Sequence, residues 1–250
     1  MNRAALVLFC LLLLAPPAAA LVGGATKVAG SHAAVTIVGS RGNFCTGVHI
    51  ARDLVLTAAH CVVPSAEYKI VAHDAKGQPY LRDIAQIARH PQFDIGNYNK
   101  ARVTPDLALL KLAEPANATP VTISGAKLNV APGDPFIVSG LGLSQHGDGK
   151  SGGTLRMATL VATGKPGNLQ IRLMDPATQN KSAGLGACTG DSGAPVFMEK
   201  DGRHVVIGLV SWSTGPNSEA GCGGLTGVTP LQLYYPWIVE TARKLGSPLP

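Results

Sequence analysis

The chain has 250 residues, of which 46% are hydrophobic and 14% are charged, and its formal net charge is +6. The basic residues are scattered and form no run of five or more. This excludes a nucleic-acid-binding tract, and we expect no nucleic-acid partner. No segment is a low-complexity linker and no repeat of fixed period is present, which excludes a repeat architecture.

The first twenty residues have the features of a signal peptide. Arg3 provides a positive charge, residues 4–14 are apolar, and residues 18–20 are three alanines that form a small-residue cleavage site. The apolar run is too short to span a bilayer as a helix, and the alternative, an uncleaved anchor, would need a longer one. We therefore expect a secreted protein, extracellular or periplasmic, whose mature chain covers 21–250 and has no membrane contact.

Short apolar segments separated by turn residues recur along the mature chain. Short strands with Gly and Pro between them indicate an antiparallel all-β architecture. Prolines and glycines within 113–135 favour a connection between two halves at that point. The strand candidates are 35–38, 54–57, 107–112, 136–139 and 205–210.

A helix is predicted clearly only at the end of the chain. It begins at Pro236, and Gly246 with Pro248 stops it. A terminal helix after a β body would cover an exposed barrel edge. Its apolar residues recur at helical spacing: Ile238, Val239, Ala242 and Leu245.

Four cysteines remain once Cys10 is removed with the signal peptide. An even number in an exported chain predicts two disulfide bonds, but four cysteines permit three pairings and the residues alone do not select one. The CxxC spacing of many zinc sites is missing, and 74–80 lack the paired carboxylates of a calcium loop, so we expect no metal and no cofactor. The four are Cys45, Cys61, Cys188 and Cys222.

Three separate segments supply the residue types of nucleophilic catalysis. Gly190-Asp191-Ser192-Gly193 is a turn in which glycines allow a sharp bend and close approach of a substrate carbonyl. His60 follows the strand candidate 54–57, and Asp106 precedes the candidate 107–112. Each feature alone is equally typical of a polar turn or a structural residue. Together they predict a triad, because serine needs a base and the base needs an acid to orient it.

The motifs resemble those of the trypsin/chymotrypsin family. The signature blocks lie at 57–61 (TAAHC), 106–110 (DLALL) and 190–195 (GDSGAP), in the order His, Asp, Ser that distinguishes this family from others. Residues 21–24 (LVGG) are similar to the family's mature N-terminus, and Ser211-Trp212-Ser213 is similar to its substrate-pairing segment. The resemblance covers essentially all of 21–250.

The resemblance implies two six-stranded antiparallel β-barrels, the first at about 21–120 and the second at about 121–250, with the active site between them. It implies that His60 acts as general base and acid, that Asp106 orients it, and that Ser192 is the nucleophile of a serine endopeptidase. The N–H groups of Gly190 and Ser192 would then form the oxyanion hole.

Family pairing implies the disulfides Cys45–Cys61 and Cys188–Cys222. It also implies that the ammonium of Leu21 inserts beside Asp191, because a buried ammonium and a buried carboxylate are tolerable only as a pair. Signal cleavage after Ala20 would release Leu21 directly. We therefore predict maturation by signal removal, or by trimming of one to three residues.

The specificity pocket is predicted from the same alignment. Gly186 falls at its base with Ala187 beside it, and Ser213 and Gly227 fall on its walls. No acidic residue stands at these positions to compensate a bound Lys or Arg. The expectation is cleavage after an apolar residue, and chymotrypsin-like and elastase-like preferences both remain open.

The expected partners are polypeptide substrates and protein protease inhibitors, and nothing requires more than a monomer. The alternative function is a catalytically silent protease homologue that acts as a binding or antimicrobial protein. Loss of activity would usually appear as replacement of His60, Asp106, Ser192 or Gly190, and all four are present.

Overall fold

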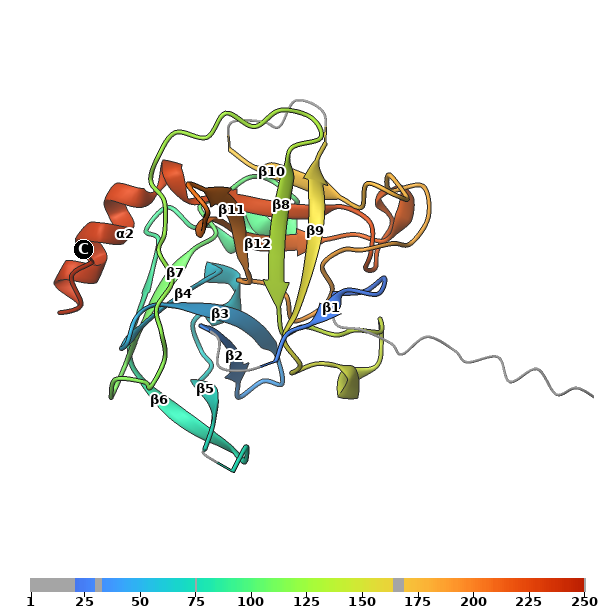
Figure 1. Ribbon diagram of the computed structural model, residues 1–250. Helices are drawn as coiled ribbons and strands as arrows, with labels where there is room; N and C mark the ends of the chain where they lie inside the picture. Colours follow the sequence, from blue (N-terminus) through green and yellow to red (C-terminus); the bar gives the residue numbers. More distant parts are fainter. Residues whose placement is uncertain (1–20, 30–32, 75, 164–168, 250) are drawn as a thin grey trace, which may run out of the picture.

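The structure is a computed structural model that describes residues 21–29, 33–74, 76–163 and 169–249 (Figure 1). Its strands form two closed antiparallel barrels of six strands each, and a helix ends the chain. The predicted fold class is therefore confirmed. The signal peptide predicted at 1–20 lies outside the described residues.

The first barrel closes in the strand order β2-β3-β4-β7-β6-β5. Its interior is filled by apolar side chains of alternating positions, among them Ile37, Val55, Ile70 and Leu110. The strands are β2 (Ala34–Gly39), β3 (Phe44–Ala51), β4 (Leu54–Thr57), β5 (Tyr68–His73), β6 (Pro79–Arg89) and β7 (Ala108–Leu112).

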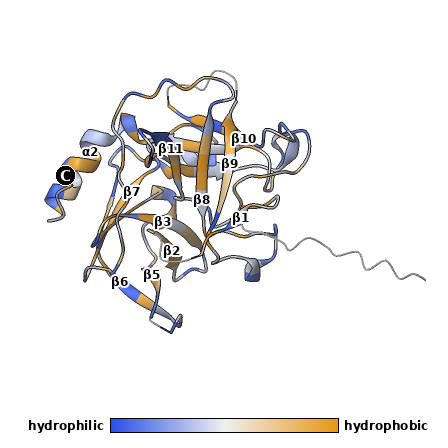
Figure 2. Ribbon diagram, viewed as in Figure 1, coloured by the Kyte–Doolittle hydropathy of each residue, from blue (hydrophilic) through white to orange (hydrophobic). Residues whose placement is uncertain are grey.

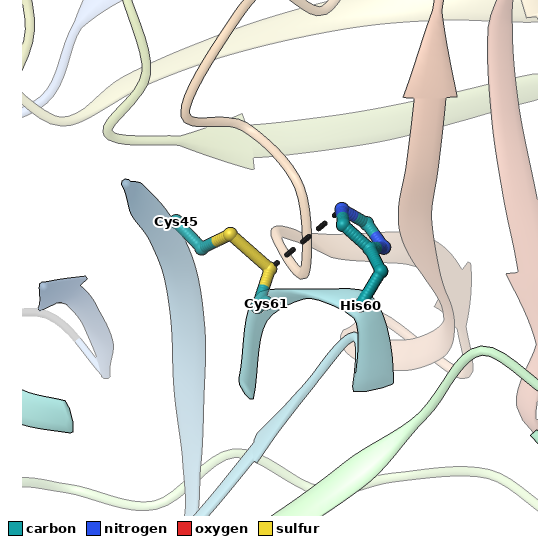
Figure 3. Close-up of side chains that lie close together, drawn as sticks. All are labelled: Cys45, His60 and Cys61. Atoms are coloured by element: carbon teal, nitrogen blue, oxygen red, sulfur yellow. Dashed lines mark hydrogen bonds between the residues drawn. A yellow bond between two sulfur atoms is a disulfide. The ribbon is translucent and has the colours of Figure 1, made fainter. Parts of the chain in front are cut away.

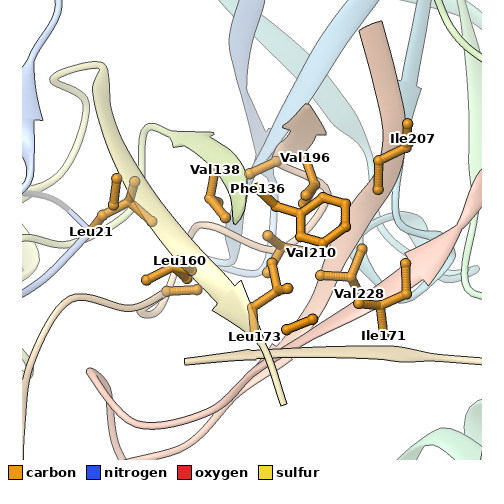
Figure 4. Packing of buried hydrophobic residues seen from close by; sticks show 14 of the residues in the cluster. Leu21, Phe136, Val138, Leu160, Ile171, Leu173, Val196, Ile207, Val210 and Val228 are labelled. Carbon is orange, nitrogen blue, oxygen red and sulfur yellow. The ribbon is translucent and has the colours of Figure 1, made fainter. Parts of the chain in front are cut away.

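The second barrel closes through pairing of β8 with β9, and β1 (Thr26–Lys27) adds to the outer edge of β9. Leu21 is fully buried in its core with Val138 and Leu160 (Figure 4). The N-terminal residues thus pack on the second barrel. The strands are β8 (Pro135–Gly140), β9 (Arg156–Ala162), β10 (Ile171–Met174), β11 (Pro195–Lys200), β12 (Arg203–Ser213) and β13 (Thr226–Pro230).

A third apolar cluster joins the two barrels. It combines Leu54 and Leu109 of the first barrel with Leu209 of the second, and Ile238 and Ala242 of helix α2 (Tyr235–Lys244) complete it. Figure 2 shows hydrophobic and hydrophilic residues together along α2, as expected for a helix with one buried face. The predicted terminal helix is therefore present, and it covers the junction between the barrels.

A second, shorter helix lies before β7. This helix, α1 (Ile95–Asn99), has five residues and is capped by Asp94, whose carboxylate accepts the Asn97 N–H at 3.0 Å. The sequence did not predict it, since five residues are too few to show a helical period. Within the described part of the chain, no helix has the length and apolar character needed to cross a bilayer.

Replacing Ile238 by alanine should lower the free energy of unfolding by about 3 kcal/mol, because Ile238 is fully buried where both barrels meet α2. Urea denaturation followed by tryptophan fluorescence measures this. Glu240→Ala is the matched control on the exposed face of the same helix, and it should change the midpoint little. Equal effects of the two substitutions would contradict the role assigned to α2.

Candidate active site

His60 stands at the end of β4, where the chain turns into a short 3-10 helix at Ala59–Val62. The hydroxyl of Thr57 donates to the Thr46 carbonyl at 2.8 Å and ties this end of β4 to β3. The His60 side chain is 13% exposed, so one edge of the imidazole stays open to the surface while the rest is packed.

Asp106 precedes β7 and is 1% exposed. One carboxylate oxygen accepts the backbone N–H of His60 at 2.9 Å, and the other lies 2.8 Å from His60 Nδ1. The Ser211 hydroxyl, from β12 of the second barrel, donates to that second oxygen at 2.6 Å. A carboxylate held in this way fixes the plane of the imidazole and directs Nε2 outward.

Ser192 lies in a turn that glycines make possible. Gly190 has φ +92° and Gly193 has φ +79°, and a Cβ on Gly193 would come within 2.2 Å of the Thr46 carbonyl oxygen. The Gly190 carbonyl accepts the Thr46 hydroxyl at 2.8 Å, and the Ser192 carbonyl accepts the Thr46 N–H at 2.8 Å. Among the residues described, the N–H groups of Gly190 and Ser192 donate to no other group of the chain, so both are available to an oxygen anion.

His60 lies beside the disulfide Cys45–Cys61 (Figure 3). Cys61 Sγ lies 3.8 Å from His60 Nε2 and 3.7 Å from the Ser192 carbonyl oxygen. Within the described residues, no direct hydrogen bond joins Ser192 Oγ to Nε2, and such bonds often tighten only when a substrate is present. The sulfur atoms beside His60 are bonded to each other and are not thiolates that could hold a metal.

The second disulfide, Cys188–Cys222, lies directly before the Ser192 turn. Both bonds follow the pairing that the resemblance implies, and disulfides of this kind are typical of an oxidising compartment.

Asp191 is completely buried behind the turn. Its carboxylate accepts the N–H of Gly142 at 2.8 Å and that of Cys188 at 2.9 Å. Burial raises the pKa of Asp191 to about 7, and the two backbone donors and the charge of Arg156 oppose this rise. Leu21 is also fully buried, and its neighbour Val22 bridges to Gly186. The predicted pair of Leu21 with Asp191 stays a prediction.

The predicted pocket residues are brought together in part. The Ala187 N–H donates to the Thr226 hydroxyl at 3.0 Å, and Thr226 is the cross-strand partner of Ser213. Gly227 instead pairs with Trp212, and a Cβ on Gly227 would lie 2.0 Å from the Trp212 ring. The assignment of Gly186, Ala187, Ser213 and Gly227 to the specificity pocket stays a prediction.

One residue near the site was missed by the sequence analysis. Tyr98 of α1 stacks on His60, with ring centroids 4.4 Å apart and an interplanar angle of 15°. No motif marks Tyr98, which lies in a stretch of polar and small residues.

The fold and this arrangement define a two-barrel protein in which Ser192, His60 and Asp106 lie in one region between the barrels. Comparison with protein families agrees, because residues 21–238 match the family model described as Trypsin. The match covers most of the chain, and the chain therefore belongs to the trypsin family of serine proteases.

Stability should depend on pH through Asp191 when residues precede Leu21. The pKa of about 7 lies above the usual 3.8, so folding favours the protonated carboxyl. The resulting stabilisation is full below about pH 4 and is lost as the pH rises through 7, by at most about 4 kcal/mol. Urea midpoints between pH 4 and 8 should show this slope in a form extended by two residues before Leu21.

Asp191→Asn should flatten that slope, because an amide does not ionise. Asp201→Asn, at an exposed turn residue, is the control and should leave it unchanged. If the urea midpoint changed with pH equally in the parent and in the Asp191→Asn form, the pH dependence could not be assigned to Asp191.

Proposed function

We propose that the protein is a secreted serine endopeptidase in which Ser192 is the nucleophile, His60 the general base and acid, and Asp106 the residue that orients His60. The observation that carries this proposal is the buried Asp106 carboxylate, which holds His60 by two hydrogen bonds and receives a third from Ser211. The Gly190 and Ser192 N–H groups are proposed as the oxyanion hole, since neither is used within the described chain.

The proposed reaction proceeds through an acyl-enzyme. His60 Nε2 takes the proton of Ser192 Oγ as this oxygen attacks the scissile carbonyl carbon, and the carbonyl oxygen becomes an oxyanion at the two N–H groups. His60 then gives the proton to the leaving amine, and the C–N bond breaks. Water, activated by His60 in the same way, hydrolyses the ester and restores Ser192.

The pocket before the scissile bond is proposed to take an apolar residue. Gly186, Ala187, Ser213 and Gly227 carry no charge, so a Lys or Arg side chain would be desolvated without a partner. Chymotrypsin-like and elastase-like preferences both remain open.

Maturation is proposed to follow export. Removal of 1–20 would give Leu21 an ammonium group, and this cation would compensate the buried Asp191 carboxylate. Once charged and paired, Asp191 would keep its hydrogen bonds to Gly142 and Cys188 and so hold the Ser192 turn. Residues 21–250 are proposed to form one protease domain, which would act as a monomer on polypeptides and be open to protein inhibitors.

A fluorophosphonate should label Ser192 in the secreted protein, and mass spectrometry of the same sample should find Leu21 at the N-terminus. Ser192→Ala should abolish labelling. Asp106→Asn should slow it by roughly 10³- to 10⁴-fold, because the amide favours the wrong tautomer of His60. A folded chain that begins at Leu21 and stays unlabelled would instead support the silent homologue acting as a binding or antimicrobial protein.

With peptide nitroanilides, kcat/KM for an apolar residue before the scissile bond should exceed that for Lys or Arg by at least about tenfold, because the proposed pocket offers a cation no charged partner. Dominant cleavage after Arg or Lys by the parent enzyme would show that the pocket is assigned to the wrong residues.

A further inference from the structure

Tyr98 covers the open face of His60. Its phenol ring lies nearly parallel to the imidazole at 4.4 Å, and Phe93 supports it from the side with ring centroids 6.4 Å apart. The face of the imidazole that borders the substrate groove is thus occupied by a side chain of the protein itself.

The Tyr98 hydroxyl makes a second contact in the groove. It donates to the main-chain carbonyl of Ser211 at 3.0 Å. The Ser211 side chain is turned the other way, toward Asp106, so its carbonyl is the group that faces the groove. Ser211 belongs to the segment proposed to pair with substrate backbone, and this carbonyl is therefore an acceptor that a substrate N–H would need.

Little room remains beside the tyrosine. A cavity of about 20 Å³ lies between Tyr98, the 101–104 segment, Gln170, Ser211 and Trp212. A space of this size holds about one water molecule and no amino-acid residue. A peptide in extended conformation that uses the Ser211 carbonyl would therefore compete with the Tyr98 hydroxyl for it.

The segment that carries Tyr98 is suited to move. None of the five residues of α1 is buried, and Ile95 is 43% exposed. Just after the helix, Ala101 adopts φ +53°, a conformation that is unfavourable for alanine. A helix of this length without a buried face has little local stability of its own.

We propose that Tyr98 is a gate of the substrate groove, closed in the resting protein and displaced when an extended polypeptide brings its own N–H to the Ser211 carbonyl. The gate rests on the proposed function, because it would regulate the access of substrates to the same active site. Only ligands that reach past the scissile residue along the groove compete with Tyr98. The closed state lowers the apparent affinity for such ligands and leaves the bound complex unchanged.

Tyr98→Phe removes the hydroxyl and keeps the stacked ring. Loss of one hydrogen bond from the closed state should lower KM for tetrapeptide nitroanilides between about twofold and tenfold, with kcat unchanged. The rate for nitrophenyl acetate, which reaches Ser192 without the Ser211 carbonyl, should stay within about twofold. Tyr80→Phe, at an exposed tyrosine of the first barrel, is the matched control and should change neither rate.

Binding in a Ser192→Ala background tests the gate independently of catalysis. The affinity of a blocked tetrapeptide of alanine and valine, measured by calorimetry, should rise by the same factor when Tyr98→Phe is added. Equal or weaker binding would mean that Tyr98 is a fixed wall and would overturn the gate. Failure of Ser192 to react with fluorophosphonate would remove the proposed function, while this binding comparison would still decide the gate.

Discussion

The carboxylate of Asp106 is the group through which the two barrels are joined chemically. A buried charge is costly unless hydrogen bonds surround it, and Asp106 obtains its donors from His60 in the first barrel and Ser211 in the second. The barrels must therefore sit at one distance and angle for this site to be satisfied. The apolar cluster of Leu54, Leu209 and Ile238 stabilises the same contact without charge.

A second buried carboxylate, Asp191, has a different environment. Its carboxylate accepts the backbone N–H groups of Gly142 and Cys188, and burial raises its pKa to about 7. It is thus only partly ionised near neutral pH. The ammonium group of a new N-terminus at Leu21 would supply the cation that pairs with this carboxylate. Leu21 already lies in the adjacent core. Processing and catalytic geometry would then be linked through one ion pair.

The sequence predicted the parts of the molecule that depend on local pattern. Short apolar segments gave the strands, and signature blocks gave His60, Asp106 and Ser192, which the structure brings to one region between the barrels. The features it missed depend on long-range geometry. Pairing of β1 with β9, the register that puts Thr226 beside Ala187, and the stacking of Tyr98 on His60 all join residues far apart in sequence. No local propensity encodes such contacts.

The residues of the bond-cleaving step and those that control substrate entry differ in the same way. The residues proposed for bond cleavage lie within motifs, because their roles demand fixed residue types and exact hydrogen-bond partners. Tyr98, the residue proposed to control entry, lies outside every motif, and its effect depends on a single hydroxyl. Access can therefore be altered by single substitutions that leave Asp106, His60 and Ser192 untouched. In the resting arrangement the Ser211 carbonyl accepts the Tyr98 hydroxyl. In the proposed gate, substrate binding therefore begins when a substrate N–H replaces this hydroxyl at the carbonyl.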